Sequence, residues 1–118
     1  MTTLKESLEQ LGDLHDVRVS SFTWDAYFGN LEFKFEDIYA NFRGLENYPG
    51  PKPDSIILRQ VKEVVFDLDA SGNPHIYEFL VTELEGESLA TVLFRPSGRI
   101  TAKFTSADFP EVPYADLA

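Results

Sequence analysis

The chain has 118 residues, no cysteine, and twenty acidic against ten basic residues, which gives a net charge of −10. This length fits a single domain over residues 1–118, and the lack of cysteine excludes disulfides, thiolate metal ligands and cysteine nucleophiles. The basic residues are scattered rather than clustered, so we expect no nucleic-acid partner, and an anionic membrane surface would repel the chain. With neither a signal-like start nor a long apolar run, we expect a cytoplasmic protein.

The first segment is predicted to be a short helix over residues 3–11. Leu4, Leu8 and Leu11 recur at helical spacing and give one apolar stripe. Thr3 followed by Glu6 matches a capping box, and Gly12 stands where a helix ends in a left-handed turn.

The following segment, residues 14–105, is predicted to be a β-rich core. Residues 17–24 alternate with a change of phase at Ser20 and Ser21, which indicates a bulge. Further alternating runs at 31–36, 38–42, 56–58, 61–68, 76–84, 89–94 and 99–104 are separated by turns rich in Gly, Pro and Asn. Residues 47–54 contain three prolines and are expected to form a loop, while 106–118 is expected to be a loose C-terminal tail.

This pattern predicts a mainly β (α+β) fold with one short N-terminal helix. Five to seven short antiparallel strands after a helix are typical of a β-sandwich or an open barrel. The sixteen aromatic residues suit such a core, and we assign these rings to it: Phe33, Phe35, Phe66, Phe79, Phe94 and Phe104.

The segment Asp67–Glu78 has the oxygen ligands of an EF-hand calcium loop at the required spacing, with Gly72 at position six and Glu78 at position twelve. Its flanks are predicted strands rather than helices, and Pro74 replaces an apolar residue of such loops. We interpret the segment as a hairpin turn and keep calcium affinity as the alternative.

The adjacent pair His15 and Asp16 is the other candidate for chemistry. Metal phosphohydrolases use such a dyad, but they need further His and Asp ligands, and His75 is the only other histidine. We therefore predict a structural role, no catalytic residues, no metal site and no cofactor, and keep His15 and Asp16 as an alternative pocket.

Binding residues are expected among the acids and the aromatics. Glu83, Glu85 and Glu87 form an acidic rim on a predicted turn, whose simpler interpretation is a solvated hairpin tip. We expect surface positions, as anchors for a partner, for four aromatic residues: Trp24, Tyr27, Tyr39 and Tyr48.

Four short stretches together carry a resemblance: Leu14-His15-Asp16 with Val19, Leu31–Phe35, Phe42–Leu45 and Val64–Leu68. Their order resembles small bacterial β-rich domains of unknown function, some of which are labelled immunity proteins of polymorphic toxin systems. The resemblance implies an intracellular binder with no catalytic residues to carry over.

The leading hypothesis is a non-enzymatic, acidic protein-binding domain that meets a basic protein partner, with toxin neutralisation as the specific candidate. One alternative is a small-molecule-binding barrel or weak hydrolase with a pocket near His15, Asp16 and Trp24. Another is a self-assembling structural unit, a homodimer paired through an edge strand.

Overall fold

Eight strands and one helix make up the regular structure of the computed structural model, which describes residues 3–46, 48–68, 75–95 and 97–109. The helix is α1 (Leu4–Gln10), and two short 3-10 turns are η1 (Gly12–Leu14) and η2 (Ala40–Phe42). The strands are β1 (Val19–Asp25), β2 (Asn30–Phe35), β3 (Asp54–Arg59), β4 (Glu63–Leu68), β5 (His75–Leu84), β6 (Glu87–Arg95), β7 (Gly98–Phe104) and β8 (Ser106–Asp108).

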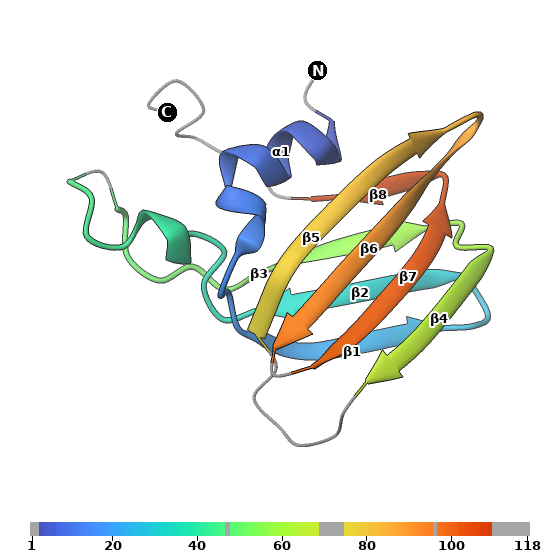
Figure 1. Cartoon of the computed structure of the whole chain (residues 1–118), viewed down its shortest axis with the longest axis horizontal. Coiled ribbons are helices and arrows are strands. Elements are labelled where there is room, and N and C mark those ends of the chain that lie inside the picture. The colour runs from blue at the N-terminus through green and yellow to red at the C-terminus, as the bar shows by residue number, and fades with distance from the viewer. Residues whose placement is uncertain (1–2, 47, 69–74, 96, 110–118) are drawn as a thin grey trace.

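The strands form two four-stranded antiparallel sheets that pack face to face (Figure 1). One sheet has the order β1-β2-β3-β8 and the other β4-β7-β6-β5. The predicted mainly β fold with one short N-terminal helix is confirmed, in the form of a sandwich of two open sheets rather than a closed barrel. The described residues form eight strands, one more than the largest number expected, because Ser106–Asp108, expected to belong to a loose tail, pairs with β3.

The core lies between the sheets, where alternate residues of each strand meet. Leu31, Phe33 and Phe35 of β2 are fully buried, and the rings of Phe33 and Phe79 meet edge to face at 5.4 Å between centroids. Five of the six predicted core rings are confirmed as buried. The prediction for Phe66 is wrong: its side chain is 42% exposed, because β4 lies at a sheet edge.

Helix α1 covers the edge of the second sheet at β5. The Thr3 hydroxyl accepts the Glu6 N–H at 3.1 Å, as the capping box predicts, although the Glu6 carboxylate bonds to the Thr3 hydroxyl instead of a backbone N–H. Leu4, Leu8 and Leu11 are buried, so the predicted apolar stripe is confirmed. Gly12 adopts φ +68°, the expected left-handed conformation.

The first hairpin also follows the sequence. The register between β1 and β2 shifts between Val19 and Ser21, which confirms the predicted bulge. In the turn, the Asp25 carboxylate accepts the N–H groups of Tyr27 and Phe28 at 3.0 and 3.1 Å, and Gly29 adopts φ +68°.

Two local predictions are wrong. Residues 38–42 do not continue an alternating strand; Ala40–Phe42 forms the 3-10 turn η2. Strands β4 and β5 are not a hairpin, because they lie at opposite edges of their sheet. The flanks of the proposed calcium loop are strands, as expected, and residues 69–74 of that loop lie outside the described residues.

Candidate functional site

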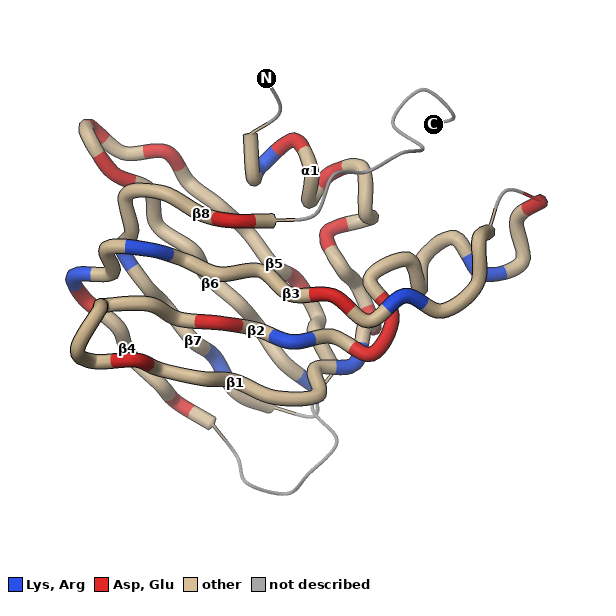
Figure 2. The backbone as a smooth tube through the Cα atoms, turned by 180° about the vertical axis from the view of Figure 1, so that it is seen from behind, with Lys and Arg blue, Asp and Glu red and all other residues tan. Residues whose placement is uncertain are grey.

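The predicted acidic rim lies at the tip of the β5–β6 hairpin. Glu83, one residue before the end of β5, lies opposite Ser88, and Glu87 begins β6 opposite Leu84. Gly86 closes the turn with φ +76°, a conformation that glycine adopts at little cost. Figure 2 shows the acidic segments of this tip at the end of the long hairpin, beyond the body of the sandwich.

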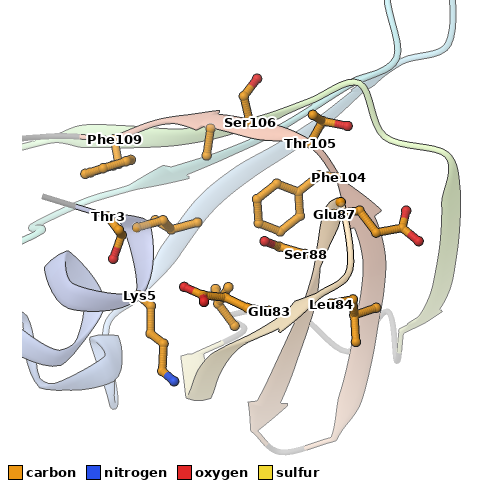
Figure 3. A pocket seen from close by; sticks show the side chains of 14 residues that line it. Thr3, Lys5, Glu83, Leu84, Glu87, Ser88, Phe104, Thr105, Ser106 and Phe109 are labelled. Carbon is orange, nitrogen blue, oxygen red and sulfur yellow. The ribbon is translucent and has the colours of Figure 1, made fainter. Parts of the chain in front are cut away.

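Two of these acids, Glu83 and Glu87, line a cavity of about 350 Å³ that we call the hairpin groove. Its walls are the start of α1 at Thr3–Lys5, the hairpin residues between Val81 and Ser88, and the segment from Phe104 to Phe109. Figure 3 shows the Phe104 ring between the hairpin and the β8 segment, with the Glu83 carboxylate on the helix side and that of Glu87 on the other. Glu85 is not among the lining residues.

The floor of the hairpin groove is apolar and its rim is polar. Leu4 and Phe104 belong to the buried core, and Phe109 and Val81 pack against it. Thr3, Ser88, Thr105 and Ser106 also line the groove. The arrangement can hold a side chain that has an apolar stem and a polar head, as lysine and arginine do.

The charge of the hairpin groove is negative. Two carboxylates and one amine, that of Lys5, line it. The Glu87 carboxylate faces the Lys62 amine at 3.9 Å, but that lysine is largely exposed and compensates little of the charge. Glu83 is exposed and has no ion-pair partner within the described part of the chain. The groove therefore favours a cationic ligand over an anionic one.

The four predicted surface aromatics fall into two groups. Trp24 and Tyr27 are exposed in and after β1, as expected, and Tyr27 is 89% exposed. The expectation for Tyr39 is wrong: this ring is buried and packs against Phe42, with the Lys52 amine 5.5 Å from its centroid. Tyr48 is half-buried, and its hydroxyl donates to the Asp37 carboxylate at 2.6 Å.

Asp37 organises the proline-containing loop, and the sequence did not single it out. It is buried, and its carboxylate accepts the backbone N–H groups of Tyr39 and Lys52 at 3.0 and 3.1 Å as well as the Arg43 guanidinium at 3.2 Å. Burial alone would raise the pKa of Asp37, but the hydrogen bonds from Tyr48, Lys52, Tyr39 and Arg43 outweigh it and lower the pKa below its ordinary 3.8. The hydrogen bond to Asp37 raises the pKa of Tyr48.

The alternative pocket residues do not assemble as that hypothesis requires. His15 faces Asp16 at 3.3 Å, and its Nδ1 lies 2.7 Å from the Tyr77 carbonyl oxygen. Asp16 lines a polar cavity of about 230 Å³ with Arg18, Glu36, Asp37, Ala40 and Arg43. Neither His15 nor Trp24 is among those residues, so the three predicted side chains do not share this cavity.

The groove floor could not be found from the sequence, since its residues are far apart along the chain. Leu4, Val81 and Phe104 meet only because α1, β5 and β7 converge. Within the described residues, no three His, Cys, Asp or Glu side chains are placed to hold a metal ion. No helix among those residues has the length and apolar character needed to cross a membrane.

Comparison with known proteins shows the fold but no family. No family model matches the chain, and no curated protein matches it. Among solved structures, the chain is similar to an uncharacterized protein from Neisseria gonorrhoeae, with a TM-score of 0.58 and 13% sequence identity. The likeness covers 83% of this chain and 93% of that chain. The chain thus shares its fold with an uncharacterized bacterial protein.

Proposed function

We propose that this protein is a non-enzymatic protein-binding domain and that the hairpin groove receives a basic, partly apolar segment of its partner. The observation that carries the proposal is the combination of an apolar floor at Phe104 and Leu4 with the carboxylates of Glu83 and Glu87 at the rim. A lysine or arginine of the partner would lay its stem on the floor and its charge near the carboxylates.

Charge on the whole chain supports the same choice of partner. The net charge of −10 attracts a basic protein over a distance and raises its association rate at low salt. Neutralisation of a basic toxin is the specific role we propose within this class, because the sequence resembles small bacterial β-rich domains of unknown function, some of which are labelled immunity proteins.

A titration followed by amide NMR tests the groove with defined probes. We use a short synthetic peptide of alternating Lys and Leu, and a matched peptide in which Glu replaces every Lys. The Lys peptide should shift the amide signals of Glu83, Ser88 and Phe104, and the Glu peptide should leave them in place. Shifts of equal size with both peptides, or shifts confined to other residues, would contradict the proposal.

Charge-neutral variants then measure how much each carboxylate contributes to binding of the Lys peptide. Glu83→Gln and Glu87→Gln should each weaken binding of the Lys peptide roughly two- to fivefold at low salt, which is the range of an exposed ion pair. Glu46→Gln removes the same charge from an exposed residue outside the groove, and serves as the matched control. If Glu46→Gln weakens binding as much as the groove variants do, the effect belongs to the net charge and not to the groove.

A further inference from the structure

The four edge strands of the two sheets are protected to different degrees. An edge strand presents unpaired backbone N–H and C=O groups to any strand that approaches it. Strand β8 has three residues, β1 contains the bulge between Val19 and Ser21, and α1 and η1 pack on β5. Strand β4 has six residues and pairs with β7 without a register shift. It is therefore the long, regular edge that the described part of the chain leaves open.

The side chains of β4 add apolar surface to this open edge. Val65 points to the outer face of its sheet and is 57% exposed. Phe66 and Leu68 pair with Ile100 and Gly98 on the inner face, yet about two fifths of each side chain is exposed. The strand has neither lysine nor proline, the residues that commonly prevent edge-to-edge pairing.

We propose that β4 pairs antiparallel with β4 of a second copy of this chain, so that two four-stranded sheets join into one of eight strands. The inference is independent of the hairpin groove, whose lining residues include none from β4. It identifies the edge through which the chain forms a homodimer, with a two-fold axis perpendicular to the sheet.

The side chains favour one register of this pairing. Rotation about such an axis keeps each face of the sheet on its own side, so only residues of the same face can stand opposite each other. Two registers pair five residues of each strand. The first, centred on Val65, places Glu63 opposite Asp67 of the other copy, twice, and like charges directly opposite are destabilising.

The second register, centred on Phe66, places no like charges opposite each other within Glu63–Leu68. It places Phe66 opposite Phe66 and Val64 opposite Leu68 on the inner face, and Val65 opposite Asp67 on the outer face. The inner-face row formed by Phe66, Ile100 and Val92 then continues across the axis into the other copy. We therefore assign the dimer the register centred on Phe66.

The β1–β2 turn stands next to the proposed interface. The Val61 N–H donates to the Gly29 carbonyl at 2.9 Å, which fixes the turn beside the start of β4. Tyr27 and Phe28 are exposed on this turn, with ring centroids 4.8 Å apart. These rings extend the apolar surface available to a second copy beyond the strand itself.

Sedimentation of the full chain over a wide concentration series tests the proposal. We expect a monomer–dimer equilibrium that shifts toward dimer as salt is raised, because salt screens the repulsion between two chains of charge −10 each. Hydrogen exchange should slow in Glu63–Leu68 as the dimer forms. A monomer at every concentration, or a dimer that leaves exchange in this strand unchanged, would overturn the proposal.

Two substitutions separate this edge from other surfaces. Phe66→Lys should abolish dimerisation, because it places two ammonium groups opposite each other at the axis. Leu80→Lys is the matched control, since Leu80 and Phe66 are both 42% exposed and Leu80 belongs to the opposite edge strand. Loss of the dimer with Leu80→Lys, or its persistence with a folded Phe66→Lys chain, would show that a different surface associates.

Val65→Lys tests the register and does not disturb the core. In the register centred on Phe66, the new lysine stands opposite Asp67 of the other copy, twice, and the dimer should tighten roughly two- to thirtyfold. In the register centred on Val65, two lysines would meet and the dimer would weaken. Weakening by Val65→Lys would therefore overturn the assigned register, even if Phe66→Lys behaves as expected.

Discussion

Strands β2 and β4 have the same length and a similar alternation of residues, but they occupy opposite environments. In β2, Leu31, Phe33 and Phe35 are all buried. In β4, Phe66 and Leu68 lie on the inner face and are still substantially exposed. The difference follows from their neighbours, because β2 pairs with a strand on each side and β4 with β7 alone. Alternation therefore predicts that a segment is a strand, but its depth in the core depends on its position in the sheet.

The largest expected effect comes from truncating Phe33, the buried phenylalanine of β2, whose counterpart in β4 is the half-exposed Phe66. Phe33→Ala should lower the free energy of unfolding by about 3–5 kcal/mol, because it removes a fully buried ring and leaves a cavity. Chemical denaturation followed by tryptophan fluorescence measures the change, since Trp24 is the single tryptophan. A loss below about 1 kcal/mol would mean that the ring is not enclosed as the structure has it.

The features that the sequence predicted are the local ones, and the features that it missed depend on position in the sheet. Local features were predicted well, among them the Thr3 cap, the bulge at Ser20 and Ser21, and the turn before Asn30, because each depends on residues close together in the chain. Long-range features were not. The order of strands within each sheet, which exposes Phe66 and separates β4 from β5, depends on pairings between residues that are distant in sequence.

The candidate site also has one part that the sequence predicts and one part that it does not. The acidic rim could be found, because Glu83, Glu85 and Glu87 are neighbours on one turn. The groove floor could not, since Leu4 and Phe104 are a hundred positions apart. The burial of Tyr39 was missed for a related reason: its segment forms a 3-10 turn held by Asp37, not a strand with one face in solvent.

The segment that follows β2 carries an intermediate expected effect. Just after β2, the buried Asp37 carboxylate holds the proline-containing loop through Tyr39, Lys52, Tyr48 and Arg43. Asp37→Asn should cost about 1–3 kcal/mol at neutral pH, because the charge-assisted hydrogen bonds of Tyr48 and Arg43 are lost. Asp108→Asn is the control, since Asp108 is an exposed partner of Arg59 and should contribute less than about 1 kcal/mol.

The pH dependence of Asp37→Asn gives a check with a defined sign. The pKa of Asp37 is lower in the folded chain than its ordinary 3.8, so the carboxylate stabilises the fold above that pH. This contribution is lost as the pH falls through the lowered pKa. The difference in unfolding free energy between the natural chain and Asp37→Asn should therefore shrink below about pH 4. A difference that stays constant into strong acid would exclude Asp37 as its source.

The smallest expected effect on the folded monomer is at the counterpart of Phe33. Phe66→Ala should lower the free energy of unfolding by less than about 1.5 kcal/mol at dilute concentration, because the ring already keeps 42% of its surface in water. At concentrations where the dimer forms, the same variant should lose more apparent stability. Only folded chains associate, so dimerisation adds to the apparent stability of the natural chain. Unfolding curves at low and high protein concentration measure both quantities. If Phe66→Ala costs as much as Phe33→Ala in the monomer, Phe66 is as enclosed as Phe33, and β4 is not an open edge.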